Sequence, residues 1–273
     1  MAGLNFLYRT LPGRCCLKLL SARWVSGLVG ALLDTRASQL LIRPFSRRFD
    51  IDQSEYDLTG IGTFNQFFCR PIKEDRRPVC HEPEVLIAPC DGLLKVIPVE
   101  NDTVLPVKQS AFSVGQLLRS KGLSARYEGG LCLVFRLCVN HYHRYCYIES
   151  GKKSRDRYIP GRLNTVRPVA LRERPVFCEN SREYCLIKTE TVGTLVQMEV
   201  GAMLVGKIRN KEPANALVRR GNEKGHFEYG GSTIIVLIQK DRIRIDREIL
   251  TSSAEGAETP VKMGQKIGST IRA

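Results

Sequence analysis

The chain has 273 residues, of which 43% are apolar and 26% charged, a composition typical of a globular protein with a sizeable core. Its formal charge of +14 favours a polyanionic partner, either nucleic acid or the surface of an anionic membrane. The ten cysteines include no CxxC pair and no secretory segment accompanies them. We therefore expect reduced thiols, which argues against a disulfide framework and against a structural zinc site.

The first fifty residues predict a basic amphipathic helix. They hold eight Lys or Arg side chains against two Asp, a net charge of +6. The apolar residues that recur there at helical spacing are Leu17, Leu20, Trp24, Leu28 and Leu32. Because the apolar stretch 24–33 is too short to span a bilayer, we expect it to lie in the membrane interface. A helix packed on the protein core and a transit peptide are alternatives that this pattern leaves open.

The rest of the chain predicts a mainly β body. Short apolar runs, rich in Val and Ile and separated by glycine and proline, are typical of strands. They cover residues 85–88, 93–99, 131–139, 185–188, 194–200, 202–208, 233–239 and 242–246. Outside the N-terminal third, helical signal is confined to residues 113–119. The expected fold class is α+β: a mainly antiparallel β body (63–273) with an N-terminal helical membrane-contact region (1–62).

Three polar segments fall within the β body. Asp91 stands on a Pro-Cys-Asp-Gly turn, where an aspartate before glycine is normally only a turn former. His141 and His143 would face the same side of a strand, as a metal pair would, but no third ligand follows and we expect no metal. A histidine that is oriented by a carboxylate and faces a serine is instead the general-base arrangement of acyl transfer. The basic loop 158–163 suits either a pocket for an anionic headgroup or a plain connection.

The segment Gly-Gly-Ser-Thr at 230–233, directly before the apolar run 234–238, can carry chemistry on its own backbone. The hydroxyl of Ser232 can attack the carbonyl of Gly231, because glycine has no Cβ to hinder the approach. The amide becomes an ester, and β-elimination then leaves a pyruvoyl group. A hairpin turn before a buried strand is the alternative. Cutting at the second Gly-Ser-Thr would release only residues 269–273, so we expect Ser269 to be an ordinary turn residue.

Taken in chain order, these segments resemble the phosphatidylserine decarboxylases, pyruvoyl-dependent enzymes that make phosphatidylethanolamine in phospholipid biosynthesis. The segments that carry the resemblance are FNQFFCRPI (64–72), PCDG (89–92), YHRYC (142–146), YIPGRL (158–163), VGAMLVGKI (200–208), KGHFEYGGST (224–233) and VKMG (261–264). The resemblance implies a self-processing triad of Asp91, His143 and Ser232. It also implies a cut between Gly231 and Ser232 that gives chains 1–231 and 232–273. Many members carry a second histidine where this chain has Cys146, which leaves open whether His143 or His141 is the processing base.

The resemblance also implies a cofactor and partners. The pyruvoyl group made from Ser232 would take the substrate amine as a Schiff base and accept the electrons released with carbon dioxide. The implied partners are phosphatidylserine, an anionic membrane surface and the two cleaved chains, with an oligomer left open. The implied location is peripheral, on the cytoplasmic side of the cell membrane.

Other functions explain less of the sequence. A related serine phospholipid is an alternative substrate for the same chemistry. A biotinyl or lipoyl-like carrier domain would account for Lys262 in VKMG but not for Asp91, His143 or GGST. Nucleic-acid binding rests on the charge alone, since basic strands interleaved with aromatic residues are missing, and we do not expect it.

Overall fold

The computed structural model describes residues 10, 12–13, 16, 22–100, 105–107, 110–166, 176–202, 207–229 and 232–271. Within these residues the chain is an α+β protein whose named strands all pair antiparallel. The expected mainly antiparallel β body is therefore confirmed. Leu17 and Leu20 of the N-terminal stripe, and Gly231 before the expected cut, lie outside the described residues.

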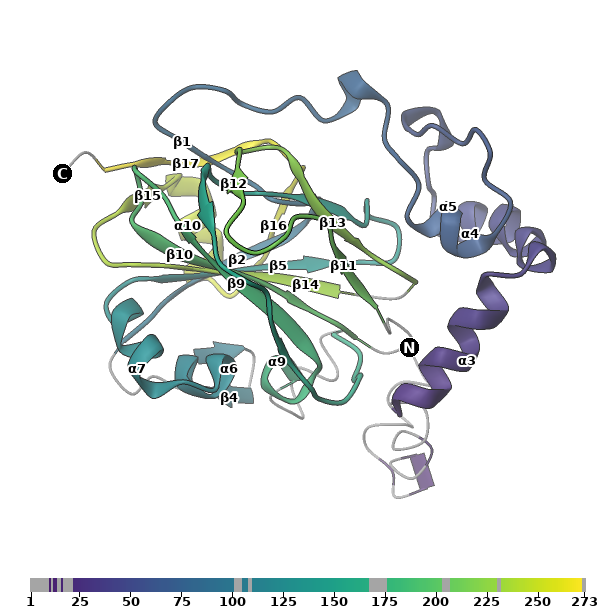
Figure 1. Ribbon diagram of the computed structural model, residues 1–273, viewed down its shortest axis with the longest axis horizontal. Coiled ribbons are helices and arrows are strands. Elements are labelled where there is room, and N and C mark those ends of the chain that lie inside the picture. The colour runs from purple at the N-terminus through teal and green to yellow at the C-terminus, as the bar shows by residue number, and fades with distance from the viewer. Residues whose placement is uncertain are drawn as a thin grey trace.

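A large sheet forms the centre of the β body (Figure 1). Its strands follow the order β12-β7-β9-β10-β14-β5-β2-β16, and β8 pairs with β9 beside this path. These strands are β2 (Gly92–Pro98), β5 (Leu131–Leu137), β7 (Gly151–Lys153), β8 (Arg157–Ile159), β9 (Arg182–Lys188), β10 (Thr194–Val200), β12 (Leu217–Val218), β14 (Ser232–Ile238) and β16 (Thr259–Val261). Every residue of β14 is buried, as its continuous apolar run predicts.

Three smaller sheets complete the β body. Their strands are β11 (Ile208–Asn210), β13 (Glu223–Phe227) and β6 (Arg144–Cys146) in one, β1 (Val85–Ile87), β17 (Lys266–Thr270) and β15 (Ile243–Ile245) in the second, and β3 (Leu105–Val107) and β4 (Ser110–Phe112) in the third. The β11-β13-β6 sheet packs on the large sheet, because Lys224 of β13 and Asn210 of β11 both contact Glu199 of β10. The chain therefore passes from the small sheet to the large one between Phe227 and Ser232.

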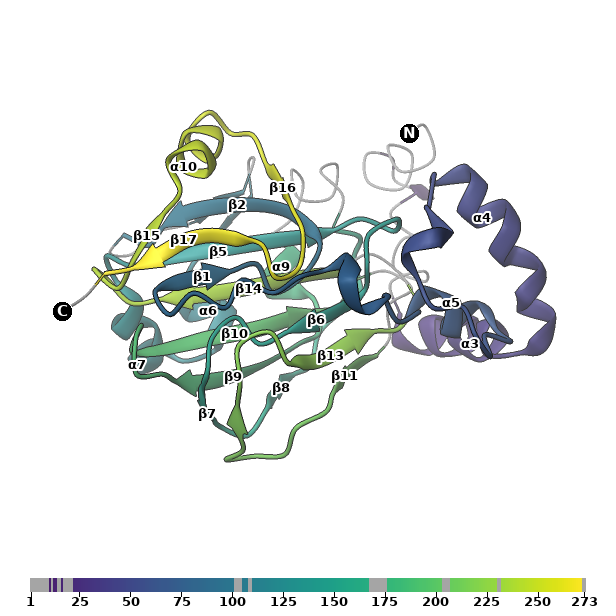
Figure 2. The ribbon, with the colours of Figure 1, turned by 90° about the horizontal axis from the view of Figure 1, so that it is seen from above.

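The N-terminal helices lie together at one end of the molecule, beside the β body (Figures 1 and 2). They are α3 (Arg23–Leu33), the 3-10 helix η1 (Arg36–Leu41), α4 (Ile42–Arg48), the 3-10 helix η2 (Gln53–Glu55) and α5 (Phe64–Phe68). α5 begins with a capping box, in which Thr63 and Gln66 satisfy each other's backbone N–H groups. Among the described residues, no helix has both the length and the apolar character that crossing a membrane requires.

Several elements of the β body have no clear pattern in the sequence. The short helices are the 3-10 helix η3 (Glu74–Arg76), α6 (Val114–Leu118), α7 (Lys121–Ser124), the 3-10 helix η4 (Ala125–Tyr127), α9 (Val176–Glu179) and α10 (Arg247–Ala254). Of these, the sequence predicts only α6. Strands β6, β7, β8 and β13 have three to five residues and carry charged side chains, so no apolar alternation marks them. Ser269 lies in β17 and not in a turn, because β17 pairs with both β1 and β15.

Candidate functional site

Ser232 is the first residue of β14, at the centre of the large sheet. It lies opposite Leu137 of β5, and its exposed fraction is 0%. Side chains alternate along a strand, so Ser232 and Ile234 point to the same face, and Ile234 lies opposite Glu199. That face is the one that the β11-β13-β6 sheet covers. The expected nucleophile is therefore enclosed between two sheets, with Leu137 of β5 as its ladder partner, while the pairing of β14 with β10 begins at the next residue, Thr233.

The side chain of His143, also 0% exposed, meets Ser232 from the residue before β6. Its Nδ1 lies 3.3 Å from the Ser232 Oγ, and its Nε2 lies 3.1 Å from the carbonyl oxygen of Cys138. A carbonyl oxygen can only accept, so Nε2 carries the proton and Nδ1 presents its lone pair to the serine hydroxyl. This is the tautomer that a general base for Ser232 needs.

Asp91 makes no hydrogen bond to His143 in the described part of the chain. Its carboxylate accepts hydrogen bonds from Arg77, at 2.8 Å from Nε and 2.6 Å from Nη2, and from the backbone N–H of Met263 at 2.9 Å. The structure thus brings Ser232 and His143 together and joins Asp91 to Arg77. The orienting acceptor, which the implied triad predicts to be a carboxylate, is the backbone carbonyl of Cys138.

A buried cation acts on His143. The pKa of His143 lies well below its ordinary value of 6.5, first because of burial and next because of the positive charge of Arg70. The Arg70 side chain is itself 0% exposed and its guanidinium lies 3.9 Å from the centre of the Tyr56 ring. The sequence alone does not single out Arg70, although it belongs to the segment FNQFFCRPI, because arginine is seldom fully buried.

His141 and Cys146, the two other residues considered for the processing step, do not contact Ser232 through any hydrogen bond in the described part of the chain. The Nδ1 of His141 accepts from the backbone N–H of Cys138 at 3.1 Å. The Cys146 thiol points at the carbonyl oxygen of Ala88, and burial raises its pKa to about 12. A thiol with this pKa is a poor proton acceptor near neutral pH, so the geometry favours His143 as the base.

Comparison with known proteins identifies the same family as the sequence motifs do. The family model described as phosphatidylserine decarboxylase matches residues 64–269, well over half of the chain. The chain belongs to the phosphatidylserine decarboxylase family. It is 42% identical to "Phosphatidylserine decarboxylase proenzyme 2" of Clostridium acetobutylicum over 98% of this chain and 91% of the relative. It is 38% identical to proteins named "Phosphatidylserine decarboxylase proenzyme" from Clostridium tetani and Ruminiclostridium cellulolyticum, over 97% and 98% of this chain and 91% of each relative.

Family membership does not favour a carrier domain, the interpretation that the sequence offered for Lys262. No group of three or more His, Cys, Asp or Glu side chains in the described residues is arranged to hold a metal ion. Lys262 is exposed after β16, but β16 pairs with β2 and β17 pairs with β1 and β15. The strands on either side of Lys262 therefore do not pair with each other in the described residues.

A cavity of about 370 Å³ lies at the junction between the N-terminal helices and β13 of this decarboxylase-family chain. Its lining includes Cys69, Arg144, His226 and Glu228, the last of which is four residues before Ser232. Arg144 donates from Nε to the carbonyl oxygen of Cys69 at 2.8 Å, which ties α5 to β6. The basic loop 158–163 does not contribute to this lining.

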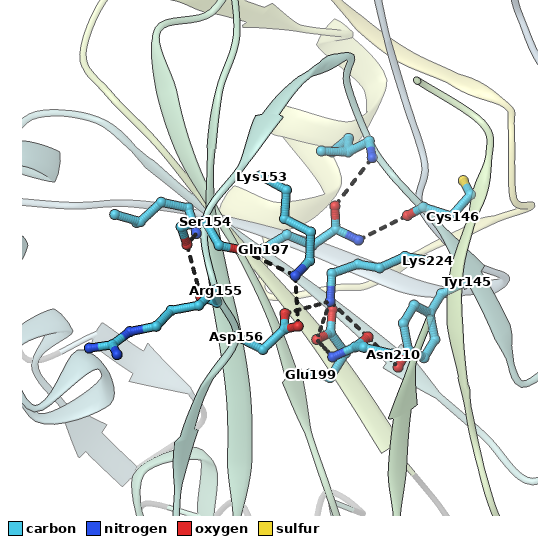
Figure 3. A network of polar contacts seen from close by, with 12 residues as sticks. Tyr145, Cys146, Lys153, Ser154, Arg155, Asp156, Gln197, Glu199, Asn210 and Lys224 are labelled. Atoms are coloured by element: carbon cyan, nitrogen blue, oxygen red, sulfur yellow. Dashed lines mark hydrogen bonds and ion pairs between the residues drawn. The ribbon is translucent and has the colours of Figure 1, made fainter. Parts of the chain in front are cut away.

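A buried ion-pair network lies between the large sheet and the β11-β13-β6 sheet (Figure 3). Lys224 Nζ donates to Glu199 at 2.7 Å and to Asn210 at 2.8 Å, while Lys153 Nζ donates to Asp156 at 2.7 Å. Tyr145 donates its hydroxyl to Asn210 at 3.1 Å. Burial raises the pKa of Glu199 to about 7, and the adjacent Lys224 opposes that rise. The network connects β13, which precedes the expected cut, to the centre of the large sheet.

Proposed function

We propose that this chain cuts itself between Gly231 and Ser232, and that the processed protein converts phosphatidylserine to phosphatidylethanolamine and carbon dioxide. The single observation that carries the proposal is the 3.3 Å contact between Ser232 Oγ and the unprotonated Nδ1 of His143. It adds geometry to the family membership, since a nucleophile and its base lie within reach at the residue where the GGST motif predicts the cut.

The processing chemistry uses groups of this chain and one water molecule. His143 takes the proton of the Ser232 hydroxyl, Oγ attacks the Gly231 carbonyl carbon, and the amide becomes an ester as the proton passes to the Ser232 nitrogen. Loss of the Ser232 α-proton then expels the Gly231 carboxylate and leaves a dehydroalanine at the new N-terminus. Addition of water and release of ammonia turn that residue into the pyruvoyl group. The pyruvoyl group supplies the carbonyl that takes the substrate amine and accepts the electrons released with carbon dioxide.

The two product chains are expected to stay together. Residues 232–273 contribute β14 to the centre of the large sheet, where it pairs with β10 and with β5. They also contribute β16, which pairs with β2, and β17, which pairs with β1. Release of the light chain would expose the fully buried strand β14 and break these ladders, a large cost in burial and hydrogen bonds.

The N-terminal region 1–62 supports a peripheral location at the cytoplasmic face of an anionic membrane. Trp24, Leu28 and Leu32 of α3 are 61%, 57% and 65% exposed, so this part of the stripe does not pack on the core. Leu40 and Leu41 of η1 are exposed as well. The exposed arginines that accompany these side chains are Arg36, Arg43, Arg47 and Arg48. An apolar surface beside arginines suits the boundary between acyl chains and anionic headgroups.

The proposal is tested by the Ser232→Ala variant, with Ser269→Ala of the second Gly-Ser-Thr as the matched control. Intact-mass spectrometry should find two chains for the wild type and for Ser269→Ala, and one uncut chain for Ser232→Ala. Only the cut proteins should release carbon dioxide from phosphatidylserine vesicles. A Ser232→Ala protein that is still cut between residues 231 and 232 would contradict the proposal.

A further inference from the structure

A short turn, Cys138 to His141, holds both peptide groups of Cys138 in place. The backbone N–H of His141 donates to the carbonyl oxygen of Cys138 at 3.0 Å. In return, the backbone N–H of Cys138 donates to Nδ1 of the His141 side chain at 3.1 Å. His141 therefore contacts Cys138 twice, once through its backbone and once through its imidazole, and the second contact requires an unprotonated Nδ1.

The same carbonyl oxygen of Cys138 is the acceptor for Nε2 of His143, at 3.1 Å. This contact fixes the tautomer of His143, the task that a carboxylate performs in a serine hydrolase triad. A backbone carbonyl can perform it only if its peptide plane is held in one orientation. The backbone N–H of His141 contacts this carbonyl, and Nδ1 of His141 holds the peptide group on the other side of the Cys138 Cα, so that together they fix the Cys138 backbone between the two peptide groups.

The turn also has a fixed position relative to the nucleophile. Leu137, the residue before Cys138, lies directly opposite Ser232 in the ladder between β5 and β14. At the end of β5, the cross-strand partner of Ser232 (Leu137) and the residue whose carbonyl orients His143 (Cys138) are therefore neighbours in the chain. A rotation of the Cys138 backbone would move the carbonyl that Nε2 of His143 contacts, and with it the His143 ring relative to Ser232 Oγ.

We propose that His141 is a positioning residue for self-cleavage, which holds the Cys138 peptide so that its carbonyl keeps His143 in the base tautomer; this rests on the proposed function of Ser232 and His143. The imidazole of His141 is suited to the task because burial lowers its pKa and keeps it neutral, although the nearby charge of Asp91 opposes that effect. Asp91 thus acts on His141 electrostatically while it is bound to Arg77.

Three variants of His141 test the assignment, because they differ in the side-chain atom that can accept the hydrogen bond from the backbone N–H of Cys138. In His141→Asn the side-chain oxygen lies as many bonds from the backbone as Nδ1 does, whereas in His141→Gln the oxygen lies one bond further out. In His141→Ala no acceptor is left. We expect self-cleavage of newly synthesised protein to slow by about 10- to 100-fold in the Ala and Gln variants, and to return to within a few-fold of wild type in the Asn variant. Equal rates for the Asn and Gln variants, or a wild-type rate for the Ala variant, would overturn the assignment.

A second measurement reads the tautomer of His143 directly. In the uncut Ser232→Ala protein, the ¹⁵N resonances of the His143 imidazole should report a proton on Nε2, and adding His141→Ala should give a mixture of tautomers. An unchanged tautomer would contradict the positioning role even if the variant is cut slowly. These outcomes are separate from failure of the proposed function, which would appear as an uncut wild type or a cut Ser232→Ala protein.

Discussion

The ring of Tyr229 packs edge-on against the ring of Phe64, with centroids 5.1 Å apart and planes at 74°. Tyr229 stands three residues before Ser232, and Phe64 is the first residue of α5. Tyr229 also packs edge-on against Phe68 at 5.1 Å, and Phe68 stacks on the His143 ring at 4.0 Å. Helix α5 therefore contacts both the chain that leads to the scissile bond and the base that would activate the nucleophile.

This packing predicts that Tyr229 is needed for fast self-cleavage. Removing the ring in Tyr229→Ala should free the chain before the scissile bond and slow cleavage by about 10- to 100-fold, because small displacements of reacting groups cost that much. Tyr229→Phe keeps the ring and should remain close to wild type. A time course of intact mass on newly synthesised protein measures both variants. Equal cleavage rates in the Ala and Phe variants would show that the aromatic contact plays no part.

The sequence predicts those parts of the site that depend on long, regular patterns. The apolar run after GGST predicts a buried strand, and β14 is that strand, with Ser232 at its first residue. The sequence marks His141 and His143, two residues apart, as candidate catalytic residues, but their spacing does not show which groups each of them contacts. His143 contacts both Ser232 and the carbonyl oxygen of Cys138, whereas His141 contacts the backbone N–H of Cys138.

The missing parts of the site come from contacts that no local pattern encodes. Arg77 lies in a polar, proline-bearing passage without periodicity, yet it binds Asp91, 14 residues further along the chain. Every residue has a carbonyl group, so no residue type could have marked Cys138 as the acceptor for His143. Arg70 is fully buried against Tyr56 and Phe67, against the usual preference of arginine for the surface.

The lowered pKa of His143 predicts the pH dependence of processing. A histidine whose pKa in the folded protein is below 6.5 stays neutral as the pH falls through 6.5, so the cleavage rate should hold there and decline only at more acidic pH. Below pH 6.5 the unfolded chain binds this proton more readily than the folded chain, so His143 should also lower folding stability as the pH falls.

Removal of the Arg70 charge should shift this profile. In Arg70→Met the apolar contacts with Tyr56 and Phe67 are largely kept, but the positive charge that lowers the pKa of His143 is gone. The acid limb of the cleavage profile should move to higher pH, toward the ordinary value of the imidazole. Single-turnover cleavage rates of the two proteins across the acidic and neutral range measure the shift. Superimposed profiles would exclude an electrostatic role for Arg70.

The buried pair of Lys224 and Glu199 predicts a large loss of stability when one partner is removed. Both side chains are 0% exposed, so Lys224→Met leaves Glu199 either with an uncompensated buried charge or with a proton to take up, and it should cost about 3–5 kcal/mol in the free energy of unfolding. Lys207 pairs with Glu228 at 3.2 Å but is 51% exposed, so the control Lys207→Met should cost less than about 1 kcal/mol. Denaturant unfolding in the uncut Ser232→Ala background measures both. Similar losses in the two variants would contradict the distinction between buried and exposed pairs.

The exposed part of α3 predicts membrane binding with a salt-resistant component. Each basic side chain near an anionic surface contributes about 1 kcal/mol, and salt screens this attraction, whereas insertion of apolar side chains is insensitive to salt. Wild-type protein should therefore bind anionic vesicles less tightly, but still measurably, at high salt. Replacing Trp24 and Leu28 by serine should abolish that remaining binding and leave self-cleavage intact, because neither residue contacts Ser232 or His143 in the described structure.

A matched control separates membrane insertion from a general loss of apolar surface. Leu217 in β12 is 84% exposed, more than Trp24 or Leu28, but it belongs to the β body and not to the N-terminal region. Leu217→Ser should co-sediment with anionic vesicles at high salt as the wild type does, while the double variant of α3 should stay in the supernatant. If the α3 variant pellets like the wild type, the membrane contact lies outside this helix, and the exposed apolar surface of α3 must be covered by something other than lipid.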